Sequence, residues 1–278
     1  MLQTEKTRVQ FLDVVSTRGN SLKIAYELHT APGATEPGMV WFPGFNSNMA
    51  GAKASALKDW ALKTRRSLLC FEYSGHGSSG GEFTDGTISD WLNESLAILR
   101  EAATGPQVLV GSSMGAWLIL LILRAISRNL PLVDGLPRIE GAVLIAPAHD
   151  MTEELMWKEF PDEARLELES TGSYQRPSRY GDGPYTITQD LIEDGRNHLI
   201  GSDSFRPPCP VRIIHGIEDP DVPWKHANKL THILTGEDVM LNLVQDGDHR
   251  LSRDRDIQKL FFIIDDLYEN IAKRAHYI

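Results

Sequence analysis

The stretch VGSSMG, residues 110–115, places two serines between glycines, and only Ser113 has a glycine two residues before it and two residues after it. The preceding run QVLV is typical of a buried strand, and the following run AWLILLILRAI is typical of a buried helix. A serine on a sharp strand-to-helix bend is exposed at the sheet edge, and the flanking glycines avoid collisions there. The spacing predicts that Ser113 is a nucleophile and Ser112 a bystander; a plain tight turn is the alternative.

A serine hydroxyl becomes a good nucleophile when a histidine takes its proton and a carboxylate orients the histidine. Two later loops supply such groups: HGIEDPDVPW, after the run VRII, holds Asp219 and Asp221, and QDGDHRLS, after the run VMLNLV, holds His249. Functional groups gather at the carboxyl ends of strands in open α/β sheets, so we predict Asp219 as the acid and His249 as the base. Asp221 competes for the role of acid, although its place just before Pro223 also suits a helix N-terminus.

The negative oxygen formed during acyl transfer needs two hydrogen-bond donors. The amide of Met114, directly after the nucleophile, is one expected donor. The loop WFPGFNSN follows the first strand of the alternating pattern, and there Gly44 lets the backbone turn close to the site while Phe45 offers its amide. A simple Pro-Gly turn is the alternative for that loop.

Two further histidines are expected to be structural: His215 ends a buried strand, and His76 shapes the glycine-rich loop SGHGSSGGEF. This loop lacks the Lys-Ser/Thr ending of a phosphate-binding loop. His-Glu-x-x-His and paired Cys-x-x-Cys patterns do not occur in the sequence, so we expect neither a catalytic metal nor a cofactor.

The elements that must position these residues follow from hydrophobic periodicity. TRVQFLDV and LKIAYELHT, separated by STRGNS, predict an opening antiparallel hairpin. Beyond it, strand-like runs alternate with helical stretches; the strands are expected at 38–42, 67–73, 107–111, 141–147, 211–216 and 239–245, and the helices near 50–64, 88–103, 114–128, 223–235 and 253–274. This alternation predicts an α/β fold with a mostly parallel, doubly wound sheet and helices on both faces.

The alternation stops between residues 148 and 208 and resumes afterwards, so we expect one domain, 1–278, that carries a lid or cap insertion. Helical pieces are expected at TEELMWKEF and ITQDLIEDGRNHLI. The substrate would bind beneath this insertion, with Met156 and Trp157 of the cap and Trp117 near the nucleophile as candidate contacts. Residues of these types are more often part of the core, which is the alternative for all three.

Composition excludes several classes of protein. The net charge of −10 disfavours nucleic acid and anionic membranes as main partners. Two cysteines cannot form a disulfide framework, and the longest apolar run is too short to span a bilayer. The N-terminus shows no signal-peptide pattern. These features favour a cytoplasmic enzyme, and the oligomeric state is left open.

Together, PGFNSNMAGAKA, FEYSGHGSSGG, GSSMGAW, HGIEDPDVPW and GDHRLS resemble the alpha/beta-hydrolase superfamily over nearly the whole chain. More narrowly, they are similar to the subfamily of mammalian mitochondrial palmitoyl-protein thioesterases that also cleave acyl glucuronides. The resemblance implies Ser113 as nucleophile, Asp219 as acid, His249 as base, and Phe45 and Met114 as oxyanion-hole amides. The chain departs from the pattern at Pro43, where many members have histidine. The mitochondrial members carry a presequence, whereas the first strand predicted here begins within about ten residues of Met1, so we expect a bacterial source.

The sequence therefore predicts a serine hydrolase that cleaves an ester or thioester through an acyl-enzyme intermediate. A serine peptidase or aminopeptidase would use the same residues and differ only in the shape of its pocket. A non-catalytic ligand-binding protein of the same fold would be expected to lack one of the three groups, whereas this chain has all three. An epoxide hydrolase or dehalogenase would need a carboxylate where Ser113 stands.

Overall fold

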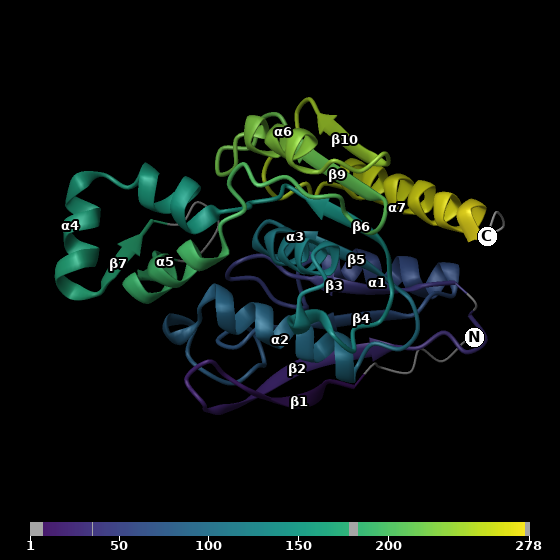
Figure 1. The fold of residues 1–278 in the computed structure, drawn as a ribbon, viewed down its shortest axis with the longest axis horizontal. Helices are drawn as coiled ribbons and strands as arrows, with labels where there is room; N and C mark the ends of the chain where they lie inside the picture. The colour runs from purple at the N-terminus through teal and green to yellow at the C-terminus, as the bar shows by residue number, and fades with distance from the viewer. Residues whose placement is uncertain (1–7, 35, 178–182, 276–278) are drawn as a thin grey trace.

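The computed structural model describes residues 8–34, 36–177 and 183–275. Within these residues, one large sheet has eight strands in the order β1-β2-β4-β3-β5-β6-β9-β10 (Figure 1). Their bounds are β1 Gln10–Val15, β2 Ser21–His29, β3 Gly38–Phe42, β4 Leu68–Phe71, β5 Gln107–Ser112, β6 Ile139–Ile145, β9 Val211–Gly216 and β10 Val239–Val244. The predicted hairpin is present: β1 pairs antiparallel with β2, and β2 with β4. The remaining neighbours pair in parallel, so the predicted fold class is confirmed.

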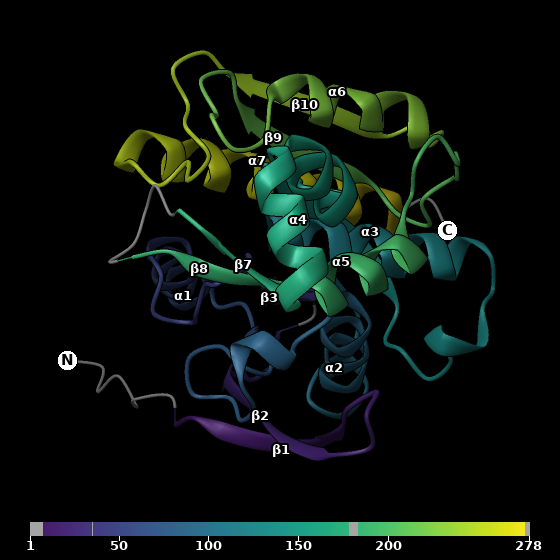
Figure 2. The ribbon, with the colours of Figure 1, turned by 90° about the vertical axis from the view of Figure 1, so that its left-hand side faces the viewer.

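Helices cover both faces of this sheet (Figures 1 and 2). Their bounds are α1 Ala52–Thr64, α2 Ile88–Glu101, α3 Met114–Ser127, α4 Asp162–Thr171, α5 Gln189–Gly195, α6 Trp224–Ile233 and α7 Asp254–Ala275, with short turns at η1 Phe83–Asp85, η2 Pro131–Val133, η3 Thr152–Met156, η4 Trp157–Glu159 and η5 Arg196–His198. Buried side chains of α1 and α7 pack on one face, and those of α2, α3 and α6 pack on the other. No helix of the described residues is long and apolar enough to cross a membrane.

The central strands are buried on both faces, which explains why they are apolar runs rather than alternating ones. All five residues of β3 and all six of β5 are buried. Along β3, Val40 and Phe42 join the core beneath α2 and α3, whereas Met39 and Trp41 join the core beneath α1 and α7. Successive side chains of a strand point to opposite faces, so both layers of helices gain apolar contacts from the same strand.

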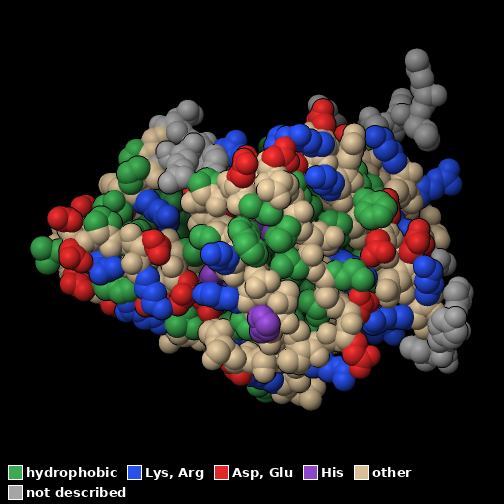
Figure 3. Space-filling view, turned by 90° about the horizontal axis from the view of Figure 1, so that it is seen from above, with side chains coloured by type: hydrophobic (Ala, Val, Ile, Leu, Met, Phe, Trp, Pro, Cys, Tyr) green, Lys and Arg blue, Asp and Glu red, His purple; other side chains and the backbone are tan. Residues whose placement is uncertain are grey.

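The segment between β6 and β9, which we call the cap (residues 148–208), extends beyond the end of the sheet (Figure 1). The two predicted helical pieces are present as η3 with η4 and as α5 with η5. The cap also contains helix α4 and an antiparallel hairpin of β7 Ser173–Arg176 and β8 Tyr185–Thr188, neither of which was predicted. Both strands have only four residues, too few for a clear period-two pattern. Seen from above, the cap surface carries acidic and basic side chains intermixed (Figure 3).

Candidate active site

Ser113 lies on the sharp bend that the sequence predicts. Strand β5 ends at Ser112 and helix α3 begins at Met114, and between them Ser113 has φ 54° and ψ −115°. A positive φ is strained for a residue with a side chain and persists only where neighbouring structure enforces it. Here the Ser113 amide donates to the Ile145 carbonyl at 2.8 Å, and its carbonyl accepts from the Ala148 amide at 3.2 Å. The bend is thus held by strand β6 and by the start of the cap.

The two flanking glycines are required because backbone passes close on both sides. A Cβ on Gly111 would lie 2.7 Å from the carbonyl carbon of Gly115, and a Cβ on Gly115 would lie 2.3 Å from the carbonyl oxygen of Phe42. Neither position has room for a side chain, since Cβ contacts below about 3 Å force atoms to move. The sequence spacing therefore has a steric cause in the fold.

The loops after β9 and β10 bring the predicted acid and base to Ser113. His249 Nδ1 lies 2.7 Å from Asp219 Oδ2, and His249 Nε2 lies 3.2 Å from Ser113 Oγ. Because the carboxylate accepts from Nδ1–H, Nε2 is left as the acceptor for the serine hydroxyl. The three residues are far apart in sequence, yet they form one continuous chain of hydrogen bonds.

Asp219 is a buried carboxylate, and both of its oxygens accept hydrogen bonds. Its Oδ1 accepts from the amides of Asp221 at 2.9 Å and Val222 at 2.8 Å. The ring Nε2 of His215 donates to the Val222 carbonyl at 2.8 Å and also lies 3.3 Å from Asp219 Oδ2. Burial alone would raise the pKa of Asp219, but hydrogen bonds from His215 and His249 outweigh it and hold the pKa well below its usual range. Asp219 is therefore ionised at neutral pH.

The competing acid, Asp221, does not bond to His249. Its amide donates a hydrogen bond to Asp219 Oδ1. Its side chain lines the pocket beside His249, and its Oδ2 is buried and has no hydrogen-bond partner among the described residues. One ligand atom each of Asp219, Asp221 and His249 lie within 4.8 Å of one another, which is a spacing suited to a metal ion. Asp219 and His249 are already hydrogen-bonded to each other, so a metal there would have to break the chain that reaches Ser113.

The loop after β3 brings the predicted oxyanion donors beside the serine. A Cβ on Gly44 would lie 3.4 Å from Ser113 Cβ, so the backbone of this loop passes close to Ser113. The amides of Phe45 and Met114 have no acceptor among the described residues. Two such free N–H groups beside a serine can bind a developing oxyanion.

His76, in the glycine-rich loop, holds the loop after β3 in place, which agrees with the structural role expected for it. Its Nδ1 lies 2.9 Å from the Ser74 carbonyl and must donate, so Nε2 is the acceptor for the Asn46 amide at 3.1 Å. Burial lowers the pKa of His76, which keeps the ring neutral and Nε2 available. The glycine-rich loop therefore positions the residue next to Phe45.

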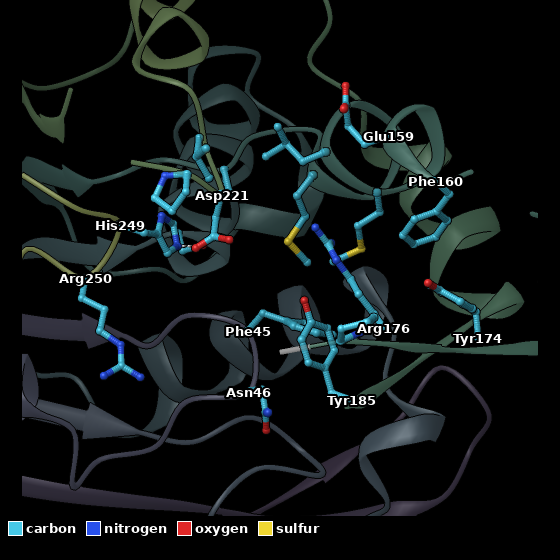
Figure 4. Close-up of a pocket in the computed structure, with 18 of the residues that line it drawn as sticks. Phe45, Asn46, Glu159, Phe160, Tyr174, Arg176, Tyr185, Asp221, His249 and Arg250 are labelled. Atoms are coloured by element: carbon cyan, nitrogen blue, oxygen red, sulfur yellow. Dashed lines mark hydrogen bonds between the residues drawn. The ribbon is translucent and has the colours of Figure 1, made fainter. Parts of the chain in front are cut away.

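A pocket of about 620 Å³ opens between these groups and the cap (Figure 4). Its wall combines apolar and polar side chains from the sheet edge and the cap. The lining residues are Phe45, Asn46, Ser113, Ala148, Met151, Leu155, Met156, Glu159, Phe160, Pro161, Tyr174, Arg176, Pro177, Tyr185, Pro220, Asp221, Val222, His249 and Arg250. A cavity of this size suits a small to medium organic group.

Of the three candidate substrate contacts, only Met156 lines this pocket. Trp117, the fourth residue of α3, is fully buried in the core. Trp157 lies on the cap, where the guanidinium groups of Arg165 and Arg196 stand over its ring at 5.8 and 5.0 Å. Neither tryptophan is among the described residues that line the pocket, although the Trp117 amide donates to the Ser113 carbonyl at 3.3 Å, next to the serine as expected.

Sequence reasoning did not single out Arg176, Tyr174 or Tyr185 as lining residues. These side chains come from the cap hairpin, which the sequence did not predict as an element. A strand-like YTIT beside two turn glycines was the available signal, since Tyr and β-branched residues favour strands.

The chain is similar to known proteins in both sequence and structure. The profile of the family described as "Alpha/beta hydrolase family" matches residues 31–266. The mouse protein named "Palmitoyl-protein thioesterase ABHD10, mitochondrial" is 34% identical over 239 residues, which cover 85% of this chain and 76% of the mouse protein. The human protein of the same name is 32% identical over 237 residues, covering 85% and 74%.

Solved structures agree with this similarity. A putative hydrolase from Agrobacterium vitis S4 superposes with a TM-score of 0.87 at 38% identity, covering 94% of this chain and 99% of that one. The mouse alpha/beta hydrolase domain-containing protein 10 superposes with a TM-score of 0.80 at 32% identity, covering 95% and 99%. The names of the mammalian relatives place those proteins in mitochondria, and the cytoplasmic location expected for this chain stays a prediction. With a family profile that spans most of the sequence and relatives above 30% identity, the chain belongs to the alpha/beta hydrolase family.

Proposed function

We propose that this protein is a serine hydrolase that cleaves carboxylic ester or thioester bonds through an acyl-enzyme intermediate. The observation that carries this proposal is the hydrogen-bond chain from Asp219 through His249 to Ser113. The chain ends on a strained serine beside two amides that have no acceptor among the described residues. The chemistry needs only protein side chains, backbone amides and water. Similarity to relatives named palmitoyl-protein thioesterase supports an acyl ester or thioester as the substrate.

The first half of the reaction transfers the acyl group to the enzyme. Ser113 Oγ attacks the carbonyl carbon while its proton passes to His249 Nε2, and the carbonyl oxygen becomes negative. That oxygen accepts hydrogen bonds from the Phe45 and Met114 amides. When the tetrahedral intermediate collapses, the alcohol or thiol leaves and takes the proton from His249 Nε2. An ester between Ser113 and the acyl group remains.

The second half releases the acid. A water molecule gives a proton to His249 Nε2 and attacks the acyl-enzyme carbonyl, and the same two amides bind the oxygen again. Collapse breaks the bond to Ser113 Oγ, which takes the proton back from the histidine. Throughout, ionised Asp219 stabilises the positive charge on the ring of His249.

Labelling with a fluorophosphonate probe, followed by assays on 4-nitrophenyl esters and acyl-CoA thioesters of several chain lengths, tests this function. The wild-type protein should take up one label and cleave at least one substrate class. Ser113→Ala should take up none and lose at least about 1,000-fold in kcat/KM, because the nucleophile is gone.

Ser112→Ala is the matched control, because Ser112 is the buried last residue of β5 and lacks the symmetric glycine spacing. We expect it to retain labelling and activity within about threefold. If the wild-type protein is folded but neither labels nor cleaves any ester or thioester above the Ser113→Ala background, the proposed function is wrong.

A further inference from the structure

Arg176 brings a positive charge into the pocket from the cap. It is the last residue of β7, and it pairs across the cap hairpin with Tyr185 of β8. Directly opposed residues of an antiparallel pair point to the same side, so both side chains face the pocket together. Figure 4 shows the Arg176 side chain extending from this hairpin into the middle of the cavity, near the Tyr185 hydroxyl.

Within the described residues, the Arg176 guanidinium forms no ion pair. Two carboxylates line the same pocket, Asp221 and Glu159, and neither is within ion-pair distance of it. Its recorded contact is with the ring of Phe160, whose centroid lies 5.8 Å from Cζ. A half-buried cation in a cavity whose wall is partly apolar is costly without an anion, because it has lost part of its hydration.

The position of Arg176 relative to His249 indicates which part of a substrate it would meet. The leaving group takes its proton from His249, so it must depart on the side of that ring, where Arg250 also lies. Figure 4 shows Phe160 and Tyr174 on the side of the pocket away from His249, with the Arg176 side chain between them and the histidine. An acyl group would therefore extend away from His249, past the methionine and leucine side chains of η3 and toward the cap hairpin.

We propose that Arg176 selects acyl groups that carry a carboxylate at their far end, so that the preferred substrates are half-esters or half-thioesters of dicarboxylic acids. The planar guanidinium can bind such a carboxylate through two parallel hydrogen bonds, and the Tyr185 hydroxyl can donate a third. The methylene chain between the two carboxyl groups would lie against the apolar wall. This inference rests on the proposed function, because it assigns the acyl side of the same reaction.

The expected preference follows from the strength of charge-assisted hydrogen bonds and the cost of covering a cation with a methyl group. Together they predict that a terminal carboxylate raises kcat/KM by about 10- to 100-fold over an uncharged acyl group of equal length. A neutral fatty acyl chain would still be cleaved, but it would leave the guanidinium without a partner.

The test compares three 4-nitrophenyl esters with eight-carbon acyl chains: the octanoate, the suberate monoester with a free carboxylate, and the suberate with its far carboxyl methylated. Arg176→Met removes the charge while keeping most of the length, and Arg176→Lys keeps the charge. Lys158→Met is the matched control, because Lys158 is an exposed cap cation outside the pocket lining. A second pair, 4-acetoxybenzoate and phenyl acetate, places the carboxylate on the leaving group instead.

We expect the wild-type protein and Lys158→Met to prefer the free suberate monoester over the methylated one by about 10- to 100-fold. Arg176→Met should lose this preference and cleave the octanoate faster than wild type, because no unpaired cation then meets the methyl end of the chain, and Arg176→Lys should retain part of the preference. Retained octanoate cleavage would also show that the variant is folded.

Equal rates on the free and methylated suberates, an unchanged preference in Arg176→Met, or a charge preference confined to 4-acetoxybenzoate would each overturn the inference. In those cases the octanoate is still cleaved and the proposed function stands. If folded wild-type protein cleaves none of the esters and takes up no fluorophosphonate, the proposed function itself fails, which is a different result.

Discussion

At Gly115 the backbone of α3 lies against the carbonyl oxygens of Phe42 and Pro43, where a Cβ would come within 2.3 and 2.5 Å. These carbonyls belong to the segment that leads into Phe45. The contact therefore sets how close the loop after β3 lies to Ser113. A glycine in a helix is ordinarily a weakness, since alanine stabilises helix interiors by about 1 kcal/mol. Here the steric cost outweighs that gain.

We therefore predict that Gly115→Ala destabilises the protein by about 1–3 kcal/mol, because backbone must move to admit the methyl group. Displacement of the loop should also lower kcat by about 100-fold, as expected when one oxyanion donor is lost. Urea denaturation and ester hydrolysis measure the two effects.

Gly80→Ala is the matched control for Gly115→Ala, since a Cβ there would meet only ordinary contacts, the nearest at 3.5 Å. It should leave stability within about 0.5 kcal/mol and activity unchanged. Equal tolerance of alanine at both positions would show that the close packing at Gly115 is not needed.

At the scale of elements, α2 contributes a buried acid that ties it to the glycine-rich loop. Glu94 Oε2 accepts from the Ser74 amide at 2.9 Å, and its other oxygen has no partner among the described residues. Burial raises the pKa of Glu94 to about 7, with the charge of Asp90 adding to the effect and the Ser74 hydrogen bond opposing it. The folded protein thus keeps a proton on Glu94 that the unfolded chain loses near pH 4 to 5.

This difference predicts a pH-dependent stability. As pH rises from about 4.5 to 7, the folded state binds more protons than the unfolded state, so the free energy of unfolding falls, by up to about 3 kcal/mol from this group. Glu94→Gln cannot ionise and keeps an oxygen for the Ser74 amide. It should therefore be more stable than wild type at pH 8, with a much smaller difference at pH 4.5.

Denaturant unfolding at both pH values measures the Glu94 effect, with Glu101→Gln, an exposed acid at the end of the same helix, as control. The control should follow wild type at both pH values. A Glu94→Gln stability difference that is the same at pH 4.5 and pH 8 would contradict the argument, because an ionisation must disappear below its pKa.

At the scale of the whole molecule, the cap begins and ends beside the same carboxylate. Asp150 lies two residues after Ala148, whose amide donates to the Ser113 carbonyl. The Asp150 carboxylate accepts hydrogen bonds from the amides of Ile200 at 2.7 Å and Gly201 at 2.8 Å. Asp150 has φ 55°, a conformation that asparagine also tolerates. The first and last parts of the cap are therefore held together next to the nucleophile.

Replacing Asp150 by Asn keeps the shape but leaves an amide nitrogen that cannot accept a hydrogen bond. We predict a loss of about 1–3 kcal/mol and faster hydrogen exchange at Ile200 and Gly201, with little change in β5. Hydrogen exchange read by mass spectrometry resolves these segments. Asp162→Asn, on the exposed side of α4, should exchange like wild type; protection at residues 200 and 201 that is unchanged in Asp150→Asn would exclude this role.

Much of the fold and the candidate site could be read from the sequence because their signals are local. Strand and helix positions follow from hydrophobic period, and the alternation of β and α elements selects the parallel sheet. Ser113 has a glycine two residues before it and another two residues after it. Asp219 and His249 each follow a run of residues that is recognisable as a strand. Since parallel strands all end at the same edge, such residues meet without any knowledge of packing.

Only the tertiary structure decided which side chains face the substrate space. Trp117 and Arg176 have no local feature that separates a core residue from a pocket residue: the tryptophan packs into the core under α3, and the arginine points into the cavity. His215 likewise comes within reach of Asp219 only through the turn of the β9 loop. The sequence by itself determined the elements and the candidate reactive residues, because both are set by spacing along the chain. The pocket depends on how the cap hairpin and η3 dock over the sheet edge, and that docking is decided by contacts between residues distant in sequence.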